Sequence, residues 1–151
     1  MPRLAAGLLA LVGIVPAHAE TPTWTRFGGP TGDFRTPAKA PGKLDPSAVR
    51  WRVPVGPGES SVVGDGARLY TVEGGRDKAD PTRGVERVIA VNPRDGKRLW
   101  EHEYPVTGLP KGGPPVKGGT SGPQATPCVV GGRVVAVGYT GRVTALDAAT
   151  G

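Results

Sequence analysis

The feature that most constrains the fold is a sequence unit that occurs twice. Residues 61–73 match residues 126–138 at an offset of 65, and residues 86–96 match residues 141–151 at an offset of 55. The difference between the two offsets is a ten-residue insertion in the first copy, within residues 74–84. A supersecondary unit that recurs along a chain buries its apolar surface against its neighbours. We therefore expect the chain to fold as stacked repeats.

Turn residues divide each copy into short strands. In the first copy we expect strands at residues 62–63, 68–73, 87–92 and 97–104, separated by tight turns rich in Gly and Pro. The middle strands are apolar on both faces, whereas the last strand alternates acidic with aromatic residues. Buried inner strands and a half-exposed outer strand are typical of propeller blades stacked face to face. The sequence predicts an all-β fold of four-stranded antiparallel blades.

Trp51 and Trp100 mark equivalent positions, 49 residues apart, at the start of two extended runs. We expect residues 50–55 to be the outer strand of a further blade that closes a ring. Residues 60–104 should form one blade and residues 125–151 an incomplete one, because the second copy stops before its last strand. We therefore interpret the chain as a fragment, whose open edges would make it aggregate or unfold unless it assembles.

Residues 1–19 have the pattern of a secretory signal peptide. Arg3 precedes an apolar run over residues 4–15, and Pro-Ala-His-Ala follows with small residues at the cleavage positions. The run is too short to cross a bilayer, which disfavours the alternative of a buried or transmembrane helix. We expect cleavage after Ala19, an extended lead-in over residues 20–49, no transmembrane segment in the mature chain, and a periplasmic or secreted location.

Several motifs carry a resemblance to a known family. Ser-Ser-Val-Val at residues 60–63, Gly-Ala-Arg-Leu-Tyr at residues 66–70 and Val-Ile-Ala-Val-Asn-Pro-Arg-Asp-Gly-Lys-Arg-Leu-Trp at residues 88–100 resemble the repeats of pyrroloquinoline-quinone-like (PQQ-like) propeller proteins. Leu-Asp-Ala-Ala-Thr-Gly at residues 146–151 is a common form of the same motif. The resemblance covers residues 50–151, and residues 24–34 look like the lead-in of bacterial members. It implies a partial β-propeller, about two blades of a seven- or eight-bladed ring.

The family includes both enzymes and proteins without a cofactor. Its quinone-dependent alcohol dehydrogenases need PQQ, a Ca²⁺ held by carboxylate and amide oxygens, and an Asp base. Gln124 stands where related sequences often carry an Arg, which removes one possible anion-binding group. The turn chemistry of the fold itself explains Asp65, Asp95 and Asp147, so we predict no catalytic, cofactor-binding or metal-binding residue here. The other aspartates of the chain are Asp33, Asp45, Asp77 and Asp80.

Several other chemistries are disfavoured by composition. His102 is the only histidine after the signal peptide, and we expect it to pack beside the tryptophan of its strand. Cys128 is the only cysteine, so no internal disulfide can form, and we expect a small buried residue. The sequence contains no Cys-x-x-Cys, no phosphate-binding loop and no dinucleotide fingerprint. The net charge of +6, of which Arg3 contributes one unit, is spread among acids, which disfavours nucleic-acid binding.

Two long connections must emerge at the same end of an antiparallel blade. They are residues 74–84 and 105–124, whereas the opposite end carries short turns. Loops on a rigid scaffold are the usual place for recognition, so we expect a protein or small-molecule partner there. The alternative is that both insertions are solvated decoration. Our hypothesis is an exported, non-catalytic binding or scaffolding propeller; the alternative is a fragment of a PQQ-dependent dehydrogenase-like enzyme.

Overall fold

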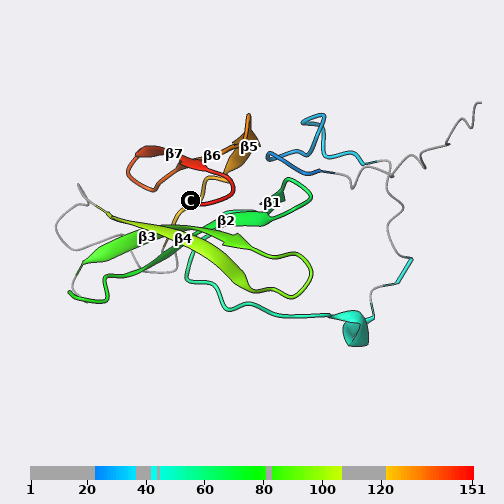
Figure 1. The fold of residues 1–151 in the computed structure, drawn as a ribbon, viewed down its shortest axis with the longest axis horizontal. Coiled ribbons are helices and arrows are strands. Elements are labelled where there is room, and N and C mark those ends of the chain that lie inside the picture. Colours follow the sequence, from blue (N-terminus) through cyan, green and yellow to red (C-terminus); the bar gives the residue numbers. More distant parts are fainter. Residues whose placement is uncertain (1–22, 37–41, 44, 81–82, 107–121) are drawn as a thin grey trace, which may run out of the picture.

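A computed structural model describes residues 23–36, 42–43, 45–80, 83–106 and 122–151 (Figure 1). The predicted signal peptide and residues 107–121 of the second long connection lie outside this part. The described residues form two antiparallel sheets of four and three strands, preceded by the short 3₁₀-helix η1 (Pro46–Ala48). None of the described helical structure has the length and apolar character needed to span a membrane. The predicted all-β propeller-type fold is confirmed.

The first sheet has the strand order β1-β2-β3-β4. Its strands are β1 (Val63–Gly64), β2 (Leu69–Arg76), β3 (Gly84–Val91) and β4 (Arg98–Pro105). Glycines with positive φ lie in both predicted tight turns, at Gly66 and Gly96, a conformation that glycine adopts without steric cost. The predicted alternation of β4 is also present, because Trp100 and His102 are half-buried while Glu101 is exposed.

The predicted loop over residues 74–84 is wrong at both of its ends. The ladder of β2 and β3 continues through it, pairing Gly74 with Glu86, Gly75 with Val85 and Arg76 with Gly84. Gly75, which suggested a turn, instead makes room for a neighbouring side chain. A Cβ atom at Gly75 would lie 2.3 Å from Nη1 of Arg87, which crosses that position.

The second sheet contains β5 (Cys128–Val130), β6 (Arg133–Val137) and β7 (Val143–Asp147) in that order. In the part of the chain that the structure describes, no fourth strand pairs with β7. Figure 1 shows this sheet stacked on one face of β1–β4, with the segment that follows η1 on the opposite side.

The core lies between the two sheets. Tyr70, Val88 and Ala90 of the first sheet pack with Val134 and Ala136 of the second, and all five are 0% exposed. Full burial of a large apolar side chain contributes about 1.5–3 kcal/mol. The core therefore joins the two sheets as consecutive blades.

Each indole of the predicted outer strands docks on the following blade. Trp100 donates from Nε1 to the Ala148 carbonyl at 3.2 Å, and its ring lies over Gly151, where a Cβ atom would be 3.0 Å away. Trp51 repeats this arrangement one blade earlier, with the Pro93 carbonyl at 3.0 Å and its ring over Gly96. The surroundings of the two tryptophans are equivalent.

Residues 50–55 have no strand assignment, although we expected an outer strand there. A strand is defined by its ladder partner, and no described segment pairs with these residues. The assignment of an outer strand to residues 50–55 therefore stays a prediction.

The lead-in connects the inner strands of both blades. Trp24 and Gly64 of β1 exchange two backbone hydrogen bonds, at 3.0 and 2.8 Å, and Val129 of β5 donates to the Thr25 carbonyl at 2.7 Å. The ring of Trp24 packs on Gly29, which has a φ of 77°. The segment therefore holds together the edges of two sheets that lie far apart in sequence.

Candidate functional site

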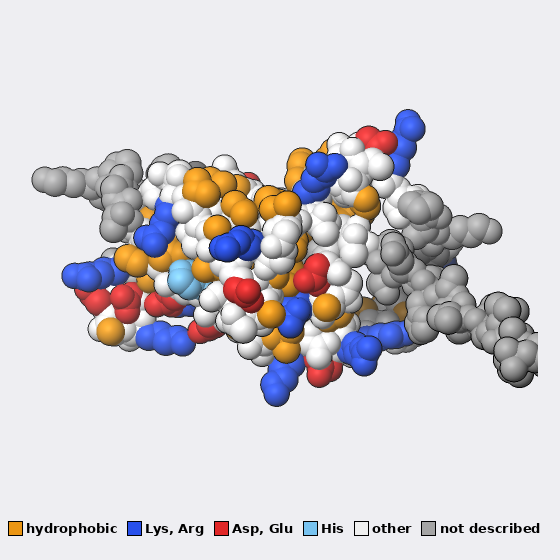
Figure 2. All heavy atoms as spheres, turned by 45° about the horizontal axis from the view of Figure 1, so that its top comes forward, with side chains coloured by type: hydrophobic (Ala, Val, Ile, Leu, Met, Phe, Trp, Pro, Cys, Tyr) orange, Lys and Arg blue, Asp and Glu red, His pale blue; other side chains and the backbone are white. Residues whose placement is uncertain are grey.

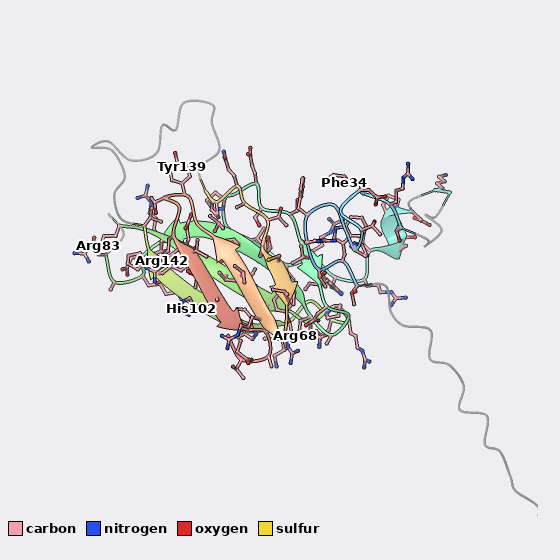
Figure 3. The ribbon with its side chains drawn as sticks, turned by 90° about the horizontal axis from the view of Figure 1, so that it is seen from above. Phe34, Arg68, Arg83, His102, Tyr139 and Arg142 are labelled. Carbon is pink, nitrogen blue, oxygen red and sulfur yellow. The ribbon has the colours of Figure 1, made fainter. Side chains whose placement is uncertain are left out.

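The candidate site is the end of the two sheets where their longer connections gather. We call it the long-loop face, formed in the described structure by residues 56–61, 77–80, 83, 122–127 and 138–142. Figure 3 places Arg83, Tyr139 and Arg142 toward this end, and Arg68, from the turn between β1 and β2, toward the other. The antiparallel order of each sheet requires this arrangement, because every second connection emerges on the same side.

The two interblade links lie side by side on this face. Glu59 donates from its backbone N–H to the Pro123 carbonyl at 2.9 Å, and Ser61 donates in the same way to Oγ1 of Thr126 at 3.2 Å. Gly122, in the second link, approaches Pro57 of the first link this closely only because it has no side chain. A Cβ atom at Gly122 would lie 2.3 Å from the Pro57 oxygen. The links therefore form a continuous backbone surface across both blades.

A buried carboxylate holds the turn between β6 and β7. Glu86 of β3 is 2% exposed, and its Oε1 accepts the Tyr139 N–H at 2.7 Å. Gly138 leaves the space for this carboxylate, because a Cβ atom there would lie 2.2 Å from Oε2. The guanidinium of Arg142 lies 4.7 Å above the ring of Tyr104. Burial and the charge of Glu86 raise the pKa of Tyr104 above its ordinary value.

This turn exposes two side chains on a fixed backbone. Tyr139 is 40% exposed, and Arg142 is also exposed. Both lie within four residues of Gly138, whose backbone N–H donates to the Arg142 carbonyl at 2.8 Å. A tyrosine and an arginine on a rigid turn provide a large contact area and five guanidinium donors for a partner.

A second buried carboxylate holds the link at residues 54–56. Glu73 of β2 is 4% exposed and accepts the Gly56 N–H at 2.8 Å and both terminal nitrogens of Arg98, at 3.0 and 2.9 Å. Arg98 also donates to the Pro54 carbonyl at 2.9 Å. Burial opposes ionisation of Glu73, but the Arg98 and Gly56 hydrogen bonds outweigh it and lower its pKa. Glu73 likewise raises the pKa of Arg98.

The tip of the β2–β3 hairpin contains charged side chains that interact with each other. Asp77 accepts the backbone N–H of Ala79 at 2.8 Å through Oδ1. Asp80 pairs with Nε of Arg83 at 3.0 Å, and Lys78 lies 3.6 Å from Glu101. Pairs with this degree of exposure contribute about 0–1 kcal/mol, so the tip offers charges to a partner more than it stabilises the fold.

The aspartates considered as candidates serve local turns. Asp65 accepts the N–H groups of Ala67 and Arg68 at 2.9 and 2.7 Å and the hydroxyl of Tyr70 at 2.7 Å. The remaining candidates do the same with residues two to three positions ahead: Asp33 with Arg35, Asp45 with Ser47, Asp95 with Lys97, and Asp147 with Ala149 and Thr150. The backbone hydrogen bonds to Asp147 lower its pKa. Among the described residues, no three His, Cys, Asp or Glu side chains group as metal ligands.

Three other residues were singled out by the sequence, and only Gln124 lies on the long-loop face. His102 is half-buried, and its ring centroid is 6.2 Å from that of Tyr104. Cys128 is partly exposed in β5, so the expected burial of this side chain is only partial. Gln124 is exposed on the interblade link.

Sequence reasoning missed the contribution of Glu86, Tyr139 and Arg142. One signal was present: Glu86 lies near the start of a strand whose remaining residues from Val88 to Val91 are apolar, and it is only 2% exposed. A buried carboxylate requires hydrogen-bond donors, but the sequence alone does not identify a backbone N–H 53 residues away as that donor.

Comparison with known proteins assigns the family. The model of the family described as outer membrane protein assembly factor BamB, a PQQ-type repeat family, matches residues 42–151. A search of curated proteins finds no match. The matched range includes both blades and the docked Trp51, which agrees with the propeller-type fold. The chain therefore belongs to the outer membrane protein assembly factor BamB family of PQQ-type repeat proteins.

Proposed function

We propose that this protein is an exported, non-catalytic propeller that binds protein partners during outer membrane protein assembly. The family description supports the setting. The observation that carries the proposal is the turn at residues 138–142, where Glu86 fixes the backbone and leaves Tyr139 and Arg142 exposed.

Protein recognition suits this surface for two reasons. Tyrosine and arginine are the side chains that, with tryptophan, most often dominate the binding energy of protein interfaces. A backbone held by buried carboxylates loses little conformational entropy when a partner binds. The paired charges at the hairpin tip, such as Asp80 with Arg83, lie at the same end of the sheets (Figure 3) and suit the polar rim of an interface.

The proposal includes export through a signal peptide at residues 1–19, with cleavage after Ala19 and a periplasmic location. The assembly of outer membrane proteins takes place at the envelope, so a leader of this kind agrees with the family description. We also propose that binding requires neither PQQ nor Ca²⁺.

Site-specific photocross-linking tests the proposed surface. A photoreactive phenylalanine replaces Tyr139 in one variant and Arg94 in a matched control, since Arg94 is exposed on the short turn between β3 and β4. In the envelope of producing cells, position 139 should cross-link to outer membrane proteins or to proteins that assemble them, and position 94 should not. Equal cross-linking from both positions, or none from position 139, would contradict the proposed face.

A charge reversal provides an independent check. Arg142→Glu should weaken the cross-link from position 139 at least about tenfold if the guanidinium contributes a hot-spot interaction of about 1.4 kcal/mol or more. Arg94→Glu makes the same change of charge on the opposite end and should leave the cross-link unchanged. Similar weakening by both variants would indicate a general electrostatic effect instead of recognition at the turn.

A further inference from the structure

The end of the two sheets opposite the long-loop face is rich in Lys and Arg. The short turns that follow β1, β3 and β5 emerge there, because every second connection of an antiparallel sheet lies on the same side. Trp51 docks on Pro93, in the turn between β3 and β4, and so brings its two neighbouring arginines to this end. We call this surface the basic end, and its cations are Arg50, Arg52, Arg68, Arg94, Lys97 and Arg133.

The cations of the basic end are not paired with acids. Among the residues that the structure describes, none of the six forms a salt bridge. Three aspartates on the same turns, Asp65, Asp95 and Asp147, accept backbone N–H groups of their own turns. At the opposite end, cations are mixed with acids and paired, as Arg83 is with Asp80 (Figure 2). The basic end therefore keeps an excess of positive charge.

A groove of about 190 Å³ joins the basic end to the lead-in. Trp24 of the lead-in lines this groove together with Arg68 and Pro93, which belong to the turns after β1 and β3. Figure 1 shows the lead-in, in blue, at the same end of the molecule as these two turns. The lead-in is therefore part of the surface that the cations surround.

The lead-in exposes two phenylalanines on a well-defined turn. Phe27 and Phe34 are 63% and 62% exposed, and their rings meet edge to face with centroids 5.0 Å apart. The Phe34 N–H donates to the Gly28 carbonyl at 2.8 Å, and the Arg26 guanidinium donates to the Pro30 carbonyl at 2.8 Å. These hydrogen bonds fix the backbone that carries the two rings.

The backbone conformation of Phe34 is unfavourable for a phenylalanine. Its φ is 62°, and every other positive φ among the described residues belongs to a glycine. Strain of this kind is found chiefly at functional positions, and a glycine would adopt the same conformation without it. Local folding therefore does not explain the aromatic ring at this position.

We propose that the basic end docks on the surface of an anionic lipid bilayer, with its cations among the headgroup phosphates and the rings of Phe27 and Phe34 inserted below them. Basic side chains near an anionic bilayer strengthen binding, and an apolar insertion combined with a basic patch gives reversible attachment. The positive charge of the basic end is complementary to such a surface. Mobile headgroups can meet cations that come from separate segments, whereas a protein partner would need carboxylates at matching positions.

The proposed orientation leaves the long-loop face accessible. Figure 3 places Phe34 and Arg68 on the side of the molecule away from Arg83, so docking through the basic end directs the hairpin tip away from the bilayer. The inference goes beyond the proposed protein recognition and does not depend on it.

Sedimentation with lipid vesicles tests the docking. The purified protein is mixed with vesicles of equal parts phosphatidylglycerol and phosphatidylcholine, or with vesicles of phosphatidylcholine alone. It should bind the anionic vesicles at least about tenfold more tightly. Raising the salt from about 0.15 M to about 1 M should release it, because the screening length falls from about 8 to about 3 Å. No binding to the anionic vesicles, or equal binding to both kinds, would overturn the proposal.

Charge reversals test which end of the molecule docks. Arg52→Glu combined with Arg94→Glu should weaken binding to the anionic vesicles at least about tenfold, because each basic side chain near the surface contributes a factor of about five. Lys78→Glu combined with Arg83→Glu makes the same change of net charge at the opposite end and should weaken binding less than about threefold. Equal weakening by the two double variants would overturn the assignment to the basic end.

Replacing the exposed phenylalanines separates docking from folding. Phe34→Gly should weaken vesicle binding at least about threefold because an inserted ring is lost. Its thermal stability should stay the same or rise, since glycine tolerates the φ of 62°. Phe27→Ser removes the other ring and should weaken binding in the same way. If both variants keep their circular dichroism spectrum and the full affinity for anionic vesicles, the proposed insertion is wrong.

Discussion

Replacing Glu73 by Gln tests whether the buried ion pair holds residues 54–56 on the first blade. The carboxylate accepts both terminal nitrogens of Arg98 at 3.0 and 2.9 Å and the Gly56 N–H at 2.8 Å. A glutamine keeps one acceptor oxygen but turns an amide NH₂ toward a guanidinium that can only donate. One charge-assisted hydrogen bond to Arg98 is lost and the other is weakened. The loss is large because the Glu73 side chain is only 5% exposed. We expect Glu73→Gln to lower the free energy of unfolding by about 2–3 kcal/mol.

Urea unfolding followed by tryptophan fluorescence measures this change. A loss of that size corresponds to a fall in Tm of roughly 10 °C for a chain of this length. Glu101→Gln is the matched control, because Glu101 also contacts Arg98, at 3.3 Å, but is 41% exposed. That variant should lose about 0.5 kcal/mol or less. Equal losses in the two variants would refute the reasoning that burial makes the Glu73 interaction strong.

Three further predictions concern the same contacts. Gly96→Ala should destabilise the chain by more than about 2 kcal/mol in urea unfolding, because its φ is 75° and the new Cβ atom would lie 2.8 Å from the ring of Trp51. Trp100→Phe removes the 3.2 Å indole hydrogen bond to Ala148 and should cost about 1–2 kcal/mol; a loss below about 0.5 kcal/mol would contradict the docking. Because the folded state lowers the pKa of Glu73, its stabilisation is full above the unfolded value near 4.3 and is lost as the pH falls further; Glu73→Gln should flatten this acid limb.

The sequence was a reliable guide to the blades because their strands are bounded by local signals. Glycines at turns such as Gly66 and Gly96, and the alternation along β4, depend only on residues close together in the chain. The equivalence of Trp51 and Trp100 was also predictable, since the glycine beneath each ring recurs at the repeat offset of 55, from Gly96 to Gly151.

The remaining features depend on contacts that no local pattern encodes. Gly75 looked like a turn residue, yet it pairs with Val85 in the β2–β3 ladder, and the side chain of Arg87 crosses it. Glu86 finds its donor at Tyr139, in the next blade. Trp24 pairs with a strand 40 residues further along the chain. These interactions depend on how the strands pair and how the two sheets stack, which the sequence predicts in kind but not in atomic detail.

The central claim, binding without catalysis, can be tested directly by a dye-linked assay of alcohol oxidation. The purified protein is incubated with PQQ and Ca²⁺, and dye reduction is measured with a series of short alcohols, alongside samples that lack either the cofactor or the ion. The account predicts that the protein adds no alcohol-dependent dye reduction to the background of the reagents. Dye reduction that requires PQQ, Ca²⁺ and alcohol together, and that increases in proportion to the protein concentration, would contradict it.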